Sequence, residues 1–272
     1  MKLALISDLH CTIGSNSRLF KNLENLKQMK LDGLFIAGDL SMHGYKFQLN
    51  PIYRWIEEYE NPVYFCLGNH DIKRQNLQKY QDFLKIQKPY YTQWLHDIPV
   101  IILNSEQQHL NEAILSDEQC DYLENELNKY QNQLVFVMVH QPLNCDIHHS
   151  KNYHIGQQQE KLQKILNQHQ QIIFLSGHLH NSYNTQNIDS NQHLQINIPS
   201  FQTPSYGRKV KGLGYIMEIE SNYFRLTPYN FIKSKAYENY AKVYYFNQHF
   251  IELSAENSFS FQHIFSKQFL QI

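Results

Sequence analysis

The chain has 272 residues, of which 42% are hydrophobic and 18% are charged, and its 24 Lys and Arg residues nearly balance its 25 Asp and Glu residues. This composition excludes a largely disordered chain, and the formal net charge of -1 argues against nucleic acid or a membrane surface as the main partner. The four cysteines are spread out with no CxxC pair, which excludes a disulfide framework. Asp8 interrupts the apolar N-terminal segment, and no run approaches the roughly 20 apolar residues of a membrane-spanning helix. We therefore expect a cytoplasmic protein with reduced cysteines.

Short apolar runs alternate with longer amphipathic segments from the N-terminus to about residue 180. The short runs predict strands at residues 3–6, 34–37, 63–66, 100–103, 134–139 and 172–175. The longer segments predict helices at residues 19–29, 53–59 and 162–166. A further helix is predicted after Ser116, which forms the pattern of a capping box with Gln119. The strands lack strict in-out alternation, so we expect them to be buried on both faces.

The pattern changes in the last third of the chain. Residues 194–198, 213–219 and 223–226 follow one another without helices and predict an antiparallel set of strands. The whole chain therefore has the pattern of an α/β fold, with β-α-β units first and further strands toward the C-terminus. We expect one domain over residues 1–230 and a C-terminal extension over residues 231–272.

The extension is rich in aromatic residues. Tyr237, Tyr240, Ala241 and Tyr244 recur at helical spacing and predict a helix with an aromatic stripe. We expect this stripe to pack on the chain's own sheet. The alternatives are that the extension covers the mouth of a site or pairs with a second subunit in a homodimer.

Polar side chains follow five of the predicted strands at the points where those strands end. They are Asp8 and His10, Asp39, Asn69-His70-Asp71, His140, and His178 with His180. In open α/β sheets, ligands bind outside the carboxyl ends of the strands. The side chains of residues two apart in an extended segment point the same way. We therefore expect Asp8 and His10 to reach one site together, and His178 and His180 to do the same. Oxygen and imidazole donors suit Mn, Fe(II) or Zn.

The order Asp-x-His, Gly-Asp, Gly-Asn-His-Asp, His, Gly-His-x-His resembles the calcineurin-like metallophosphoesterase family. The matching blocks lie between residues 8 and 180. The chain length and the later Ile-Pro-Ser-Phe stretch at residues 198–201 look similar to class III cyclic nucleotide phosphodiesterases and their bacterial relatives. The resemblance implies a four-layer α/β/β/α sandwich, with residues 1–230 as the metallophosphoesterase domain.

The resemblance also implies a site with two divalent metal ions. Asp8, His10 and His180 would bind one ion, and Asn69, His140 and His178 the other. Asp39 would bridge the two ions. His70 would be a catalytic imidazole beside the metals, and Asp71 would fix the orientation of the loop or of an imidazole.

A hydroxide held between two such ions would be the nucleophile, and His70 would protonate the leaving oxygen. We therefore expect a metal-dependent phosphohydrolase that acts on a small phosphodiester, with a cyclic nucleotide as one candidate. The alternatives are a phosphomonoesterase or nucleotide pyrophosphatase with the same site, a nuclease of the same fold, and a non-catalytic metal-binding scaffold. The near-neutral charge argues against the nuclease.

Four residues near these blocks have no assigned role. His43 follows Asp39 by four residues and either touches substrate or faces solvent. Asn144, His148 and His149 follow His140 and either line the mouth of the site or belong to an ordinary polar loop.

Overall fold

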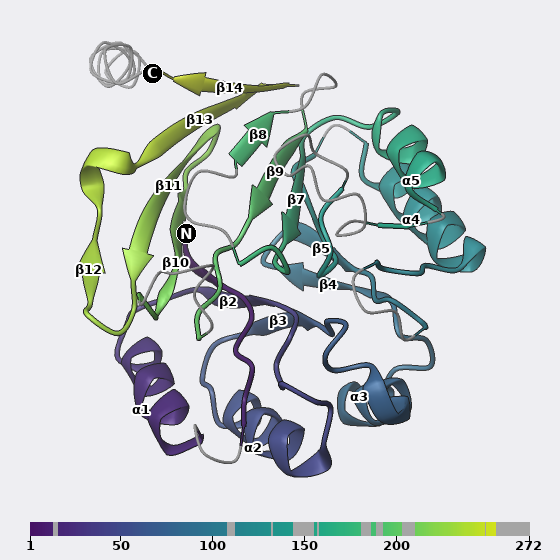
Figure 1. The fold of residues 1–272 in the computed structure, drawn as a ribbon. Helices are drawn as coiled ribbons and strands as arrows, with labels where there is room; N and C mark the ends of the chain where they lie inside the picture. Colours follow the sequence, from purple (N-terminus) through teal and green to yellow (C-terminus); the bar gives the residue numbers. More distant parts are fainter. Residues whose placement is uncertain are drawn as a thin grey trace.

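The computed structural model describes residues 1–12, 16–107, 112–131, 133–143, 155–156, 158–180, 186–188, 193–202, 210–247 and 249–253. Within these residues the strands form two sheets (Figure 1). The first sheet has the spatial order β14 (His249–Leu253), β13 (Lys242–Asn247), β11 (Tyr223–Asn230), β10 (Leu213–Ile219), β1 (Lys2–Ile6), β2 (Gly33–Ala37) and β3 (Val63–Cys66), and β12 (Lys235–Ala236) pairs with β11.

The second sheet has the spatial order β4 (Tyr91–Leu95), β5 (Ile98–Ile102), β6 (Val135–Met138), β7 (Ile172–Ser176), β9 (Leu194–Asn197) and β8 (Gln186–Ile188). Its central strands, from β5 to β9, run parallel, and β4 and β8 are antiparallel to their neighbours. In the first sheet, β1, β2 and β3 are parallel, and β10 joins β1 antiparallel.

Helices cover the outer face of each sheet (Figure 1). The helices beside the first sheet are α1 (Asn16–Lys27), α2 (Lys46–Glu57) and α3 (Asn76–Leu84), and those beside the second sheet are α4 (Asp117–Lys129) and α5 (Gln159–Leu166). Two short 3₁₀ helices, η1 (Lys73–Gln75) and η2 (Glu238–Tyr240), complete the set. The predicted α/β/β/α sandwich is therefore confirmed. No helix in the described part of the chain has both the length and the apolar character needed to cross a membrane.

The central strands are buried on both faces, as their unbroken apolar runs predict. Every residue of β2, β6 and β7 is buried. The rings of Phe35 on β2 and Phe136 on β6 lie 5.1 Å apart and join the two sheets. Burial of such side chains stabilises the sandwich by about 1.5–3 kcal/mol each before the loss of conformational entropy is counted.

Three local predictions need correction. The strand predicted at residues 194–198 does not join residues 213–219 and 223–226 in one antiparallel set, because β9 lies in the second sheet, where it is parallel to β7 and antiparallel to β8. The aromatic extension does not form the predicted helix: Tyr237 precedes the short η2, and Tyr244 lies in β13, which pairs antiparallel with β11. The Ser116 hydroxyl accepts from Gln119 N as a cap should, but the Gln119 side chain pairs with the backbone of Asn104.

Candidate metal centre

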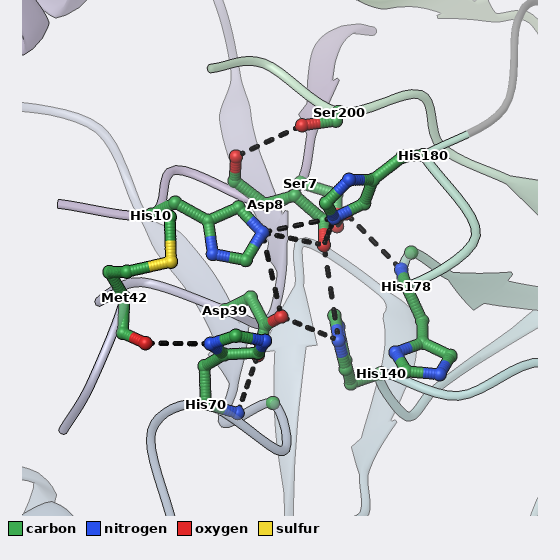
Figure 2. A network of polar contacts seen from close by, with 12 residues as sticks. Ser7, Asp8, His10, Asp39, Met42, His70, His140, His178, His180 and Ser200 are labelled. Atoms are coloured by element: carbon green, nitrogen blue, oxygen red, sulfur yellow. Dashed lines mark hydrogen bonds and ion pairs between the residues drawn. The ribbon is translucent and has the colours of Figure 1, made fainter. Parts of the chain in front are cut away.

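Six of the seven predicted metal-binding side chains lie in one cluster at the carboxyl ends of β1, β2, β6 and β7 (Figure 2). They form two groups that share Asp39, and within each group the donor atoms lie within 4.8 Å of one another. The first group is Asp8, His10, Asp39 and His180, and the second is Asp39, His140 and His178. The seventh residue, Asn69, is buried in the loop after β3.

The first group brings a carboxylate and two imidazoles to nearly one point. His180 Nε2 lies 3.0 Å from Asp8 Oδ1 and 3.0 Å from His10 Nε2. His10 Nε2 is also 3.7 Å from Asp39 Oδ2. Donor atoms this close, on side chains that are almost fully buried in the case of Asp8 and His10, are arranged as they would be around a cation.

The second group is built around His140, which is fully buried. Its Nδ1 lies 2.7 Å from the carbonyl oxygen of Ala37, so Nδ1 carries the proton in the neutral ring. Its Nε2 makes no hydrogen bond and lies 3.3 Å from Asp39 Oδ2. The His178 ring stands edge-on, with its centroid 5.1 Å from that of His140. The backbone carbonyl therefore leaves Nε2 as the ring atom of His140 that faces the shared carboxylate.

The backbone at these residues is not extended, which corrects the reason expected for their convergence. Asp8, His10, Asp39, His178 and His180 all have positive φ, between 41° and 70°. Few non-glycine residues adopt this left-handed conformation, and such strain gathers at functional sites. The side chains after β1, β2 and β7 converge because these strands end in left-handed residues, not because alternate residues of a strand point the same way.

Backbone hydrogen bonds join the ends of β1 and β2 and hold these turns in place. Asp8 N donates to Gly38 O over 3.0 Å, and His10 N donates to Asp39 O over 2.9 Å. Two glycines allow the neighbouring loops to approach. A Cβ on Gly68 would lie 2.5 Å from Asp39 N, and a Cβ on Gly177 would lie 2.8 Å from Asp8 Oδ2. Larger residues at these two positions would push the carboxylates out of the cluster.

His70 and Asp71 occupy different environments. His70 N donates to Asp39 Oδ1 over 3.0 Å, and the ring centroid lies 4.9 Å from that of His10, so the imidazole stands beside the cluster. Its Nδ1 is 2.6 Å from Met42 O (Figure 2). Asp71 is fully buried, and its carboxylate accepts hydrogen bonds from Leu40 N, Ser41 N, Ser41 Oγ and Gly68 N. Asp71 therefore ties the loop after β2 to the loop after β3.

The buried charges shift several pKa values. Burial alone would raise the pKa of Asp8 and of Asp39, but the adjacent imidazoles, His180 for Asp8 and His140 for Asp39, lower both below their usual range. Burial alone would lower the pKa of His140, but Asp39 and Asp8 raise it to about 9. Burial and the charge of His140 lower the pKa of His178 to about 3. In the metal-free protein the His140 imidazolium thus offsets carboxylate charge that a bound cation would otherwise neutralise.

Two residues that support the cluster or its neighbouring loop were not predicted. Ser7 Oγ lies 2.6 Å from Asp8 Oδ2 and 2.8 Å from Ala37 O, so it fixes the Asp8 carboxylate. Asn104 lies two residues after the end of β5, the strand beside β6. Its Oδ1 accepts from Leu67 N over 2.6 Å and anchors the loop that carries Asn69. The signal for Asn104 was present, since it is a polar residue next to the end of a buried strand.

Of the four residues without an assigned role, only His43 lies in the part of the chain that the structure describes. His43 is exposed, and its ring centroid lies 6.3 Å from that of Tyr45. Asn144, His148 and His149 lie outside the described residues, as does the chain from residue 254 onward.

Comparison with known proteins agrees with this geometry. The family model described as calcineurin-like phosphoesterase matches residues 1–182. A protein of Synechococcus sp. named probable cyclic nucleotide phosphodiesterase is 24% identical over 192 residues, which are 67% of this chain and 74% of that protein. A protein of Arcobacter nitrofigilis named probable glycerophosphodiester phosphodiesterase GpdQ is 25% identical over 166 residues, 58% of this chain and 60% of that protein.

Solved structures share the fold. A dimetal phosphatase from Danio rerio superimposes with a TM-score of 0.65 at 13% identity, covering 84% of this chain and 95% of that one. Purple acid phosphatase PPD1 from yellow lupin gives a TM-score of 0.57 at 12% identity over 87% of this chain and 52% of that one. The family model spans every residue of the cluster and more than half of the chain, and the chain therefore belongs to the calcineurin-like phosphoesterase family.

Proposed function

We propose that this protein hydrolyses a small phosphodiester with the help of two divalent metal ions bound at the cluster. The observation that carries this proposal is the sharing of one carboxylate, Asp39, by two groups of donor atoms, with an imidazole, His70, directly beside it. The names of the two curated relatives support a diester as the substrate.

The residues present fit such ions. Asp8 and Asp39 are buried carboxylates, and among the described residues their partners at ion-pair distance are histidines. Buried carboxylates are costly unless a cation neutralises them. Asp8, His10 and His180 would hold one ion, and Asn69, His140 and His178 the other, with Asp39 shared. Donors of this kind suit Mn, Fe(II) or Zn.

When bound, the two ions would neutralise charge on the phosphoryl group and activate a water molecule for attack on phosphorus. The chain supplies the rest. Because His70 Nδ1 donates to Met42 O, its Nε2 is the atom that would hold the proton for the leaving oxygen. Burial lowers the pKa of His70, against the opposing effects of Asp39 and Met42 O, so the protonated ring gives up its proton readily.

A substrate panel tests this proposal. The purified protein, reconstituted with Mn²⁺, is assayed with 3′,5′-cyclic nucleotides, a glycerophosphodiester, bis(p-nitrophenyl) phosphate and p-nitrophenyl phosphate, with metal content measured in parallel. We expect about two metal ions per chain and higher kcat/KM for diesters than for the monoester. A preference for the monoester would support the monoesterase alternative, and two bound ions without turnover would support a scaffold.

A pair of matched variants controls the panel. Asp39→Asn removes the shared charge and should lose turnover and weaken metal binding at both positions. Asp97→Asn makes the same chemical change on an exposed residue between β4 and β5 and should leave both unchanged. Equal metal content in the two variants would contradict the shared role of Asp39.

A further inference from the structure

Three side chains outside the cluster form an exposed stack, here called the platform: Tyr45, Phe47 and Arg74. The rings of Tyr45 and Phe47 are stacked, with centroids 5.0 Å apart and planes 11° from parallel. The guanidinium carbon of Arg74 lies 4.0 Å from the centroid of Tyr45, and its Nη2 donates to the Tyr45 hydroxyl over 2.8 Å. The platform is thus a continuous stack of two aromatic rings and one planar cation.

The stacking of Tyr45 on Phe47 is not needed to begin helix α2. Tyr45 is the N-cap residue, a position that favours Ser, Thr, Asp or Asn, and its side chain makes no capping hydrogen bond. The oxygen of the Gln48 side chain accepts from the backbone N–H groups of His43 and Tyr45. The extended backbone of Tyr45 lets its ring lie parallel to that of Phe47, whereas residues two apart inside a helix do not meet.

The platform is open to solvent and carries uncompensated positive charge. Tyr45 is 36% exposed and Phe47 is 47% exposed. Arg74 is also exposed, and among the described residues no carboxylate lies at ion-pair distance from it. Its φ of 64° is strained for a side chain of this type, and such strain gathers at functional sites. Single exposed aromatic residues are common on protein surfaces. A stacked aromatic pair beside a guanidinium with no carboxylate partner among the described residues is instead composed like a ligand-binding surface.

The platform is held next to the proposed metal centre by the same two loops that carry Asp39 and His70. The buried Asn76 Nδ2 donates to Gly44 O and to Lys73 O over 2.7 Å each, which fixes the loop of Tyr45 to the loop of Arg74. Met42, whose carbonyl accepts from the His70 ring, precedes Tyr45 by three residues, so their Cα atoms are at most about 11 Å apart.

The loop that leads from Asp39 to the platform contacts His70, the residue that would protonate the leaving oxygen, through the carbonyl of Met42. Figure 2 shows Met42 and His70 together on the side of His10, away from His178. A phosphoester bound at the cluster with its leaving oxygen toward His70 would therefore extend its organic group toward the Tyr45 loop.

We propose that the platform binds a planar heteroaromatic ring, of the nucleobase type, on the organic group of the substrate. Aromatic rings and guanidinium planes both stack on bases, and the remaining N–H groups of Arg74 can donate to acceptor atoms that a hydrocarbon ring lacks. This inference rests on the proposed function and deepens it, because it selects nucleotide-like esters over glycerol-type esters.

Two ligands that differ by one ring test the inference by binding instead of turnover. Adenosine 5′-monophosphate and ribose 5-phosphate share the phosphate and the ribose, and only the first carries a base. Each is titrated by calorimetry into the full-length protein loaded with Mn²⁺, with phosphate release checked in the same samples. We expect the nucleotide to bind about 5-fold to 150-fold more tightly, the range for stacking one base on an aromatic side chain.

Variants test whether the platform causes the difference in affinity between the two ligands. Phe47→Leu should bring the ratio of the two dissociation constants close to 1 while ribose 5-phosphate binds as before. Arg74→Lys keeps the charge but loses the planar group, so it should also lower the ratio. Tyr240→Leu, which removes an aromatic ring that is 71% exposed on η2, should leave the ratio unchanged.

A ratio near 1 in the unaltered protein, absence of binding by both ligands, or a ratio that survives both platform variants would overturn the inference. Failure of the proposed function has a different signature, namely two bound metal ions without hydrolysis of any phosphodiester, and it leaves the ratio of binding constants intact.

Discussion

Replacement of Gly68 by alanine should disturb the candidate metal centre, although Gly68 is not one of the predicted metal ligands. The added Cβ would lie 2.5 Å from Asp39 N and 2.7 Å from Asp39 Cγ, and closer still to Oδ1. Ordinary contacts of a Cβ start at 3.4 Å, so Asp39 must move by roughly 1 Å. Because backbone is involved, rotation of the Asp39 side chain cannot relieve the clash. A displacement of this size at a reacting centre costs about 10²-fold in turnover, and overpacking costs about 1–3 kcal/mol of stability.

Gly33→Ala provides a matched control, because Gly33 begins β2 and Asp39 follows the carboxyl end of the same strand. The three atoms nearest to its added Cβ all belong to side chains, at 3.3 Å for Leu95 and Tyr64 and 3.4 Å for Leu3. Metal content, kcat/KM for bis(p-nitrophenyl) phosphate and urea unfolding would be measured for both variants. We expect Gly68→Ala to lose metal and turnover while Gly33→Ala keeps both. Equal metal binding and equal turnover in the two variants would refute the idea that close approach of these loops places Asp39.

Other expected outcomes concern His70, His140 and the C-terminal strands. His70→Ala should keep its metal ions and lose about 10²–10⁴-fold in turnover, and less for nitrophenyl esters, whose leaving group needs little protonation; an equal loss for good and poor leaving groups would instead indicate that His70 positions the phosphate. Burial lowers the pKa of His140, but Asp39 and Asp8 raise it to about 9, so this imidazolium stabilises the metal-free protein fully below about pH 6.5 and progressively less as the pH rises through 9. Thermal unfolding in a chelator should show that decline, and His140→Gln should flatten it. Tyr244→Ala should destabilise the protein by about 3–5 kcal/mol in urea unfolding, because Tyr244 is fully buried and stacks on Phe224 at 5.1 Å, whereas the exposed Tyr240→Ala should change stability by less than about 0.5 kcal/mol.

The central strands could be predicted closely because their signal is local. A run of four or five apolar residues between polar segments has the length of a strand and is too short for a typical buried helix. Strands β1, β2, β3 and β7 lie within one residue of the predicted ranges. The approach of the polar side chains followed from the rule that parallel strands bring their carboxyl ends to one edge of a sheet. The assignment of each strand to one of two sheets has no local signal, which is why β9 was placed wrongly.

The C-terminal strands were mistaken for a helix because a run of aromatic residues satisfies more than one period. Tyr237, Tyr240 and Tyr244 recur at helical spacing, but Tyr244 and Phe246 also alternate as in a strand. In the structure both rings pack against Phe224 of β11, at 5.1 Å and 6.3 Å. β-branched and aromatic residues favour strands when an open sheet edge is available to pair with, and only the folded sheet supplies that edge.

The left-handed turns of the metal centre could not be predicted, because residue type does not reveal φ at Asp or His positions. Their conformation follows from contacts between strands: the bonds from Asp8 N to Gly38 O and from His10 N to Asp39 O exist only when β1 and β2 are paired and both strand ends have turned. The strain is therefore offset by the pairing of the sheet, which the buried apolar residues of the two strands stabilise. It follows that the donor atoms are brought within reach of one another by folding itself. Metal ions would then bind a site already in place, and the buried carboxylates, costly without a cation, give that binding its driving force.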